Sequence, residues 1–206
     1  MADPQAPMEI DAEKIPDLLP ILPLFDAVLF PKMVLPLVVM QGDSVQLVDE
    51  AMAKNRIIGL VVSQKPEGKD TPGKEDLAGI GVSALILKMA KTQDNRAQLL
   101  VQGLSRFRIK SFEEGRPYMR ARVETIKEVE EKDNETEALM SNVLGQFSRI
   151  VELSPGLPPE IGQMAKTVQE PGTLADMVAS TINATPEEKQ QVLELIDVKK
   201  RLQEVT

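Results

Sequence analysis

The spacing of the apolar residues changes near residue 130, and this change constrains the fold more than any other feature of the chain. From about residue 18 to residue 129, short runs of Val, Ile and Leu are separated by prolines, glycines or polar residues, which is typical of β-strands. From about residue 135 onward, apolar residues recur every three or four positions, as on one face of an amphipathic helix. The pattern predicts an α+β chain, in which an antiparallel β sandwich or pseudo-barrel precedes a helical bundle.

The β-rich part is expected to contain short, closely spaced strands. They are predicted at residues 21–24, 34–39, 57–62, 79–92, 97–101, 106–110 and 119–124. Because proline cannot donate a hydrogen bond to a neighbouring strand, Pro23 and Pro36 place the first two strands at an edge or a bend of the sheet. One inserted helix is predicted to begin with Asp43 or Ser44 as its cap and to extend to about Asn55.

The second half is expected to form several helices, and prolines at positions 155, 158 and 159 are predicted to end the first helix and start the next. A last helix is predicted from Thr185 to the end of the chain, because Thr185, Pro186 and Glu188 form a helix-start signal. No stop signal follows Leu202, so we expect this fragment to be truncated in its last helix. The predicted parts are a disordered leader over residues 1–17, a β-rich domain over 18–129 and a helical domain over 130–206.

The composition removes the commonest catalytic groups. The 206 residues contain no His and no Cys, which excludes a histidine base, a thiolate nucleophile and the usual zinc sites. A net charge of -8 disfavours nucleic-acid binding through this chain, since phosphates attract clustered Lys and Arg. No apolar run reaches the about 20 residues of a membrane span, and the start lacks the pattern of a signal peptide. We therefore expect a cytoplasmic protein without a membrane partner.

Two further patterns that could carry chemistry have simpler explanations. Residues 79–84 fit a loose G-x-G-x-x-[GA] phosphate-binding pattern, but they lead into a predicted strand and not a helix, which favours a bulge or close packing. Ser83 with Lys88, and Ser105 with Lys110, could form nucleophilic dyads, but nothing near them indicates a desolvated lysine. We assign no catalytic, cofactor-binding or metal-binding residue to this chain.

A basic surface is predicted on the last strands. Arg106, Arg108 and Lys110 alternate with apolar residues, so we expect the basic side chains to face solvent. A second alternation over residues 119–124 adds two more arginines. Because few exposed aromatic residues accompany them, the pattern favours a solvated sheet surface paired with glutamates over a nucleic-acid site.

The chain has ten methionines, and most are expected in the core, where Met fills irregular spaces. Met33 and Met40 differ because they lie near prolines or turn-like residues. Together with Leu35 they are our predicted substrate-binding residues, forming an exposed and adaptable apolar patch. An extended client chain could also pair with a free strand edge.

Ordered strings along residues 18–205 resemble the N-terminal domain of Lon proteases. In the β-rich half they are Leu22-Pro23-Leu24, Phe30-Pro31, Met33, Pro36-Leu37, Ala51-Met52, Pro72-Gly73, Gly81-Val82-Ser83-Ala84 and Gly103-Leu104-Ser105-Arg106-Phe107-Arg108-Ile109. In the helical half they are Pro158-Pro159-Glu160, Leu174-Ala175-Asp176, Lys189-Gln190, Leu193-Glu194, Asp197-Val198 and Arg201-Leu202.

The resemblance implies a PUA-like β fold followed by a helical bundle. It also implies a larger enzyme, whose AAA+ ATPase module and Ser-Lys peptidase domain come later in the chain and use ATP and magnesium. Lon-type enzymes of bacteria are cytoplasmic hexamers that degrade damaged or unfolded proteins and some regulators. We therefore expect a non-catalytic domain that recognises unfolded polypeptides and supports assembly. The alternative is a stand-alone LON-domain adaptor or ligand-binding protein without a protease.

Overall fold

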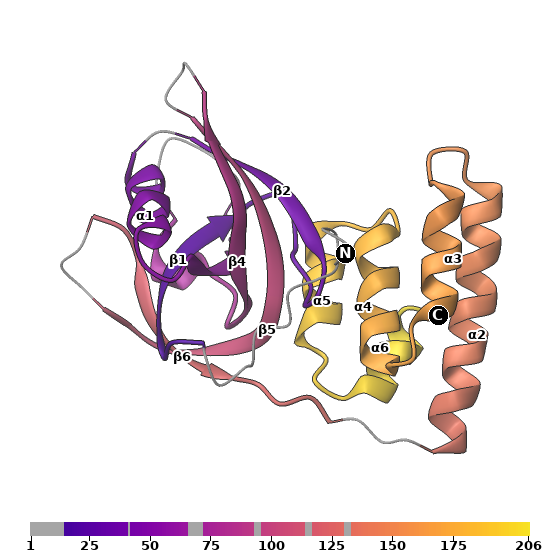
Figure 1. Cartoon of the computed structure of the whole chain (residues 1–206). Helices are drawn as coiled ribbons and strands as arrows, with labels where there is room; N and C mark the ends of the chain where they lie inside the picture. The colour runs from indigo at the N-terminus through magenta and orange to yellow at the C-terminus, as the bar shows by residue number, and fades with distance from the viewer. Residues whose placement is uncertain (1–14, 41, 66–71, 93–95, 114–116, 130–132) are drawn as a thin grey trace. The chain divides into compact units, whose positions relative to one another are not determined.

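The computed structural model of the chain describes residues 15–40, 42–65, 72–92, 96–113, 117–129 and 133–206. The chain forms two compact units, residues 1–126, called here the β unit, and residues 127–206, called the helical unit. Figure 1 shows strands throughout the first unit and helices throughout the second. Most of the predicted leader lies outside the described residues.

The strands of the β unit form a single six-stranded sheet. They are β1 (Leu18–Leu24), β2 (Val34–Val39), β3 (Ile57–Val62), β4 (Ile80–Lys91), β5 (Ala97–Glu113) and β6 (Arg120–Thr125). Their order is β2-β5-β4-β3-β1-β6, and β6 also pairs with β5. This second pairing closes β5, β4, β3, β1 and β6 into a ring, while β2 extends the sheet from β5.

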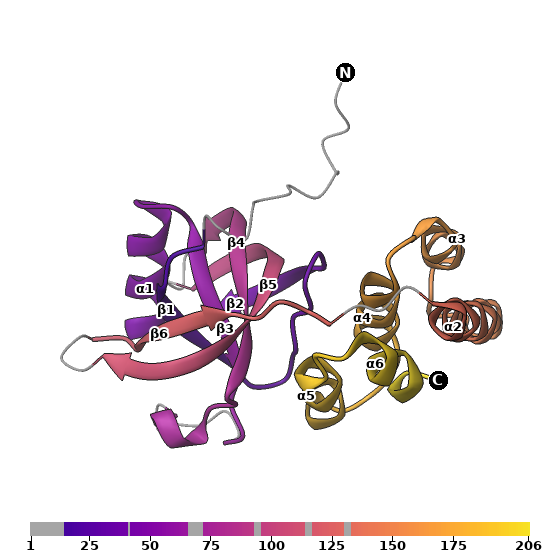
Figure 2. The ribbon, with the colours of Figure 1, turned by 90° about the horizontal axis from the view of Figure 1, so that it is seen from below.

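The sheet is mixed, which corrects the prediction of a purely antiparallel arrangement. β1 and β3 are parallel, with Ile21 opposite Gly59 and Leu24 opposite Val62, while the other pairs are antiparallel. Along the chain, β2 and the helix α1 (Asp43–Met52) separate β1 from β3. This long connection lets β3 run in the same direction as β1, whereas a short turn would join only antiparallel neighbours. Figure 2 shows α1 beside β1, which it contacts together with β3.

Strand β5 replaces two predicted strands, at 97–101 and 106–110, with one strand of 17 residues. Its first half pairs with β2 and its second half with β6, so β5 bends between them. Gly103 lies at this bend, and a Cβ there would be 2.2 Å from the Phe30 carbonyl oxygen. Gly81, in the loose phosphate-binding pattern, is also closely packed, since a Cβ would be 2.5 Å from the Leu60 carbonyl oxygen.

The interior of the ring holds an apolar cluster that includes Leu19, Ile21 and Phe107. Arg106 was predicted to face solvent, but its side chain is only 1% exposed, so that prediction is wrong. At the backbone, the Ile126 N–H, just after β6, donates to the Arg106 carbonyl oxygen at 2.9 Å. Alternation along a strand assigns side chains to two faces, but it does not show which faces other segments cover.

Among the described residues, the helical unit contains five helices, in chain order α2 (Asn134–Leu153), α3 (Pro159–Thr167), α4 (Pro171–Thr181), α5 (Pro186–Glu194) and α6 (Val198–Glu204). Figures 1 and 2 both show α2 and α3 side by side, and these two helices contact each other. The predicted start of α5 is confirmed, because the Thr185 side chain accepts from the Glu188 N–H and the Glu188 carboxylate accepts from the Thr185 N–H.

Two predicted helix boundaries are wrong. The last helix is interrupted at Leu195–Asp197, because the Asp197 side chain caps a new helix by accepting from the Lys200 N–H. Asp197 also forms a β-bridge with Val129, which ties the start of the helical unit to its end. In the β unit, the cap of α1 is Gly42, with a φ of 105°, and α1 ends at Met52. A glycine tolerates this left-handed conformation, whereas other residues are strained there.

Candidate functional site

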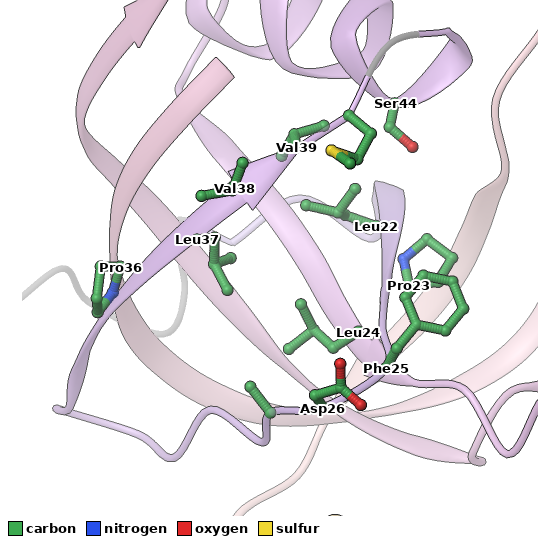
Figure 3. Close-up of a pocket in the computed structure, with 12 residues that line it drawn as sticks. Leu22, Pro23, Leu24, Phe25, Asp26, Pro36, Leu37, Val38, Val39 and Ser44 are labelled. Carbon is green, nitrogen blue, oxygen red and sulfur yellow. The ribbon is translucent and has the colours of Figure 1, made fainter. Parts of the chain in front are cut away.

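An apolar groove of about 250 Å³ lies between the end of β1 and the end of β2. Its lining residues are Leu22, Pro23, Leu24, Phe25, Asp26, Ala27, Pro36, Leu37, Val38, Val39, Met40 and Ser44. Figure 3 shows the two segments facing each other, with Leu22, Leu24 and Leu37 pointing into the space between them. We refer to this site as the groove.

The groove is bounded by one edge of β1 and one edge of β2, and neither edge pairs with another described strand along the groove. β1 pairs with β6 only over Leu18–Pro20, while its other edge pairs with β3 at least to Leu24. Within the described residues, β2 pairs only with β5, so the predicted edge position of β2 is confirmed. Such an edge normally exposes a row of unpaired N–H and C=O groups that can bind another strand.

Each of these edges carries a proline. The Ile21 N–H donates to the Met119 carbonyl oxygen at 2.8 Å, on the side of β1 that faces β6. Since N–H groups two residues apart in a strand point to the same side, the next donor on that side would belong to Pro23, which has none. Pro36 lies opposite Leu100 and likewise presents no donor. The groove therefore presents apolar side chains to a ligand, and its strand edges lack some of the N–H donors that strand pairing would need.

The groove has a buried floor and an exposed rim. Leu22 and Leu24 are buried. Both lie on the face of β1 opposite to that of Ile21, whose side chain belongs to the core of the ring. At the rim, Val38 is 59% exposed and Met40 is 48% exposed. Large apolar side chains held at such exposure beside a hollow are typical of a surface that binds another apolar group.

The structure brings only one of the three predicted binding residues to the groove. Met40 lines it, whereas Met33 and Leu35 are half-buried and do not. The sequence analysis missed the opposite wall, which Leu22, Leu24 and Phe25 supply. The strings Leu22-Pro23-Leu24 and Pro36-Leu37 were visible in the sequence, but nothing local indicated that they form two walls of one groove.

A second hollow, of about 420 Å³, lies beside α2 and α3. Half of its lining residues are polar or charged, namely Ser148, Glu152, Ser154, Gln163 and Lys166. In the groove, by contrast, Asp26 and Ser44 are the only polar residues among the described residues that line it. The side chains that line the groove are therefore more apolar than those that line the second hollow.

The groups with perturbed pKa values lie outside the groove and have local structural causes. The Lys110 ammonium, through a hydrogen bond and its charge, lowers the pKa of Glu124. Hydrogen bonds from Lys199 and from the Thr136 N–H lower the pKa of Asp133 to about 2. Burial lowers the pKa of Lys189, whose ammonium donates to the Ser180 carbonyl oxygen. Perturbed groups at an active site would converge on one cavity, and these do not.

Two further features bear on possible sites. No group of three or more carboxylates able to hold a metal ion occurs within the residues that the structure describes. In the same residues, no helix combines the length and the apolar content needed to cross a membrane.

The comparisons with known proteins agree on one family. The family described as ATP-dependent protease La (LON) substrate-binding domain matches residues 18–206. The chain is 49% identical over 210 residues to a Lon protease of Desulfosudis oleivorans and 50% identical over 196 residues to one of Syntrophus aciditrophicus. These alignments cover 100% and 94% of the chain but only 26% and 25% of the two relatives.

A solved structure supports the fold. The N-terminal domain of the Mycobacterium avium complex Lon protease aligns with a TM-score of 0.73 and 23% identity, over 91% of this chain and 95% of that one. The N-terminal domain of Lon from Xanthomonas campestris aligns with a TM-score of 0.64 and 17% identity. At these identities the likeness concerns the fold alone.

Proposed function

Because the chain belongs to the ATP-dependent protease La (LON) substrate-binding domain family, we propose that it recognises its substrates by holding their exposed apolar side chains in the groove. The observation that carries this proposal is the pairing of a buried leucine floor with an exposed rim of Val38 and Met40. Folded proteins bury most of their large apolar side chains, and unfolded segments present them. A groove of this kind therefore favours damaged or unfolded polypeptides over folded ones.

The size of the groove fits side chains better than a cofactor. Sites for small ligands have volumes of about 300–1,000 Å³, and the groove has about 250 Å³. Burial of one Leu or Phe side chain contributes about 1.5–3 kcal/mol. A single contact of this strength gives weak binding, which suits recognition of many different sequences.

We propose that the chain acts as the N-terminal part of a longer ATP-dependent protease. The chain spans about a quarter of the length of the Lon proteases that it matches, which favours this over a stand-alone adaptor. In that setting the rest of the protein would use ATP and magnesium and would carry the peptidase. A cytoplasmic hexamer would place several grooves near one client, and such multiplicity converts weak contacts into useful avidity.

The finer description of the fold also belongs to this proposal. The closed ring of strands with one inserted helix supports a PUA-like pseudo-barrel, and the contacts among α2, α3, α4, α5 and α6 support a helical bundle. The boundary predicted at residue 129 lies close to the division between the two compact units, at residue 126.

The test replaces the two exposed rim residues together, as Val38→Asp with Met40→Asp. Both side chains are about half exposed, so the double variant should fold. Its matched control is Val34→Asp, which lies on the same strand, is 50% exposed and does not line the groove. Binding of a fluorescent, permanently unfolded casein is measured by anisotropy.

We expect the double variant to bind casein at least about tenfold more weakly, because two apolar contacts are replaced by carboxylates that resist burial. The control variant should bind as the original chain does. Unchanged binding by the double variant, or an equal loss in the Val34 control, would show that the groove is not the recognition site.

A further inference from the structure

The carboxylate of Asp26 lies at the groove and pairs with no described residue. Asp26 follows Leu24 and Phe25 at the end of β1, and Figure 3 shows its carboxylate beside Leu24. Its side chain is exposed, and no cation or hydrogen-bond donor among the described residues reaches it. By contrast, Asp49 is paired with Lys91 at 2.8 Å, and Glu113 lies within 4 Å of Arg120.

Among the described residues that line the groove, Asp26 is also the only charged one. The other described side chains of the lining are apolar, apart from the neutral hydroxyl of Ser44. An apolar ligand therefore meets a single negative charge at one end of its site. A cation placed there gains a partner, while an anion is repelled.

The carboxylate also distinguishes between the two basic side chains. A guanidinium can form two hydrogen bonds to one carboxylate. Asp26 therefore favours Arg over Lys, whose ammonium is a more strongly hydrated point charge.

From these observations we propose that the groove selects polypeptide segments in which an apolar side chain lies next to a basic residue, preferably Arg. This inference rests on the proposed function and specifies the substrate class of the same site. The apolar side chain enters between Leu22, Leu24 and Leu37, and the basic residue reaches Asp26. Segments with an acidic residue in the same place bind more weakly.

The test uses three labelled peptides with the same Leu- and Phe-containing centre, flanked by Arg, by Gln or by Glu. Their binding to the 206-residue chain is measured by anisotropy at low and at high salt. The variant is Asp26→Asn, which preserves shape and removes the charge. The matched control is Asp17→Asn, because Asp17 is also exposed and lies outside the groove, and its replacement changes the net charge equally.

We expect the Arg peptide to bind roughly two- to fivefold more tightly than the Gln peptide, the range typical of an exposed ion pair. The Glu peptide should bind more weakly than the Gln peptide, and high salt should reduce both differences. Asp26→Asn should abolish the preference among the three peptides, and Asp17→Asn should retain it.

The outcomes separate this inference from the proposed function. In one outcome, all three peptides bind the original chain equally but fail to bind the variant with Val38→Asp and Met40→Asp. That result supports the groove as the binding site and refutes the preference for a basic residue. A preference that survives Asp26→Asn also refutes it, since the overall negative charge of the chain would then be its cause. If none of the peptides binds, both the proposed function and this inference fail.

Discussion

Removing the carboxylate of Asp176 should strongly destabilise the helical unit, because it leaves a buried guanidinium without one of its partners. The guanidinium of Arg201 is fully buried, and its Nη1 donates to Asp176 at 3.2 Å and to Glu128 at 3.1 Å. Its Nε and Nη2 both donate to the Leu195 carbonyl oxygen, at 2.9 and 2.7 Å. These bonds connect the start of the unit, α4, the break before α6, and α6 itself.

The magnitude follows from burial. Removing one partner of a buried pair costs about 3–5 kcal/mol, because the other charge stays buried. Asp176 is 3% exposed, but Glu128 still partly compensates Arg201, so we expect the lower end, about 3 kcal/mol, for Asp176→Ala. Glu128 is 33% exposed, and Glu128→Ala should cost only about 1 kcal/mol.

The assay is urea unfolding followed by circular dichroism at 222 nm, which reports mainly the helical unit. With a slope of about 1–1.5 kcal/mol per molar urea for a unit of this size, Asp176→Ala should lower the midpoint by about 2–3 M. Tyr118 is the only tyrosine, and its fluorescence reports the β unit separately.

A double replacement distinguishes an unpaired charge from lost packing. Arg201→Met with Asp176→Leu removes both charges and keeps the site filled, so it should be much less destabilised than Asp176→Ala. The reasoning is refuted if Asp176→Ala shifts the midpoint no more than Glu128→Ala does. It is also refuted if the double variant is as unstable as the single one.

Two further changes have defined outcomes. Gly103→Ala should destabilise the β unit by about 1–3 kcal/mol, because the added Cβ would meet the Phe30 carbonyl oxygen. The control is Gly79→Ala, since no atom lies within 4 Å of a Cβ at that position. Equal unfolding midpoints of the two variants, measured by Tyr118 fluorescence, would contradict this prediction. The pKa of Asp133 falls from 3.8 to about 2 on folding, so its contribution to stability is present above about pH 4 and is lost as the pH falls toward 2. Asp133→Asn should therefore be less stable than the original chain at pH 7 and equally stable near pH 2, as measured at 222 nm; a constant difference would contradict the assignment.

The sequence predicted local structure well where one signal decided it. The capping box at Thr185 and the prolines that start α3 depend only on residues close in sequence, and both helices begin as expected. The interruption between α5 and α6 could not be predicted, because it depends on the bridge between Asp197 and Val129, nearly 70 positions apart. Likewise, alternation placed Arg106 on one face of its strand, but alternation alone could not show that this face is buried.

The binding site was predictable only in part, for a related reason. Met40 was identified because exposed Met near a turn is unusual, and this is a property of one segment. The opposite wall depends on where β6 stops pairing with β1, and this register is set by the closure of the whole ring. A groove formed by two strand edges therefore leaves no signature in either strand alone.

The arrangement of the groove explains the positions of its two prolines. An open strand edge can pair with an unfolded chain, and continued strand pairing of this kind leads to aggregation. Pro23 and Pro36 remove an N–H donor from each edge, so a client chain cannot complete a ladder with either strand. Under the proposed function, binding then depends on apolar side chains, whose individual contacts are weak and non-directional. Such contacts release quickly, which suits the proposed role in a longer protease, where a captured client must also be released.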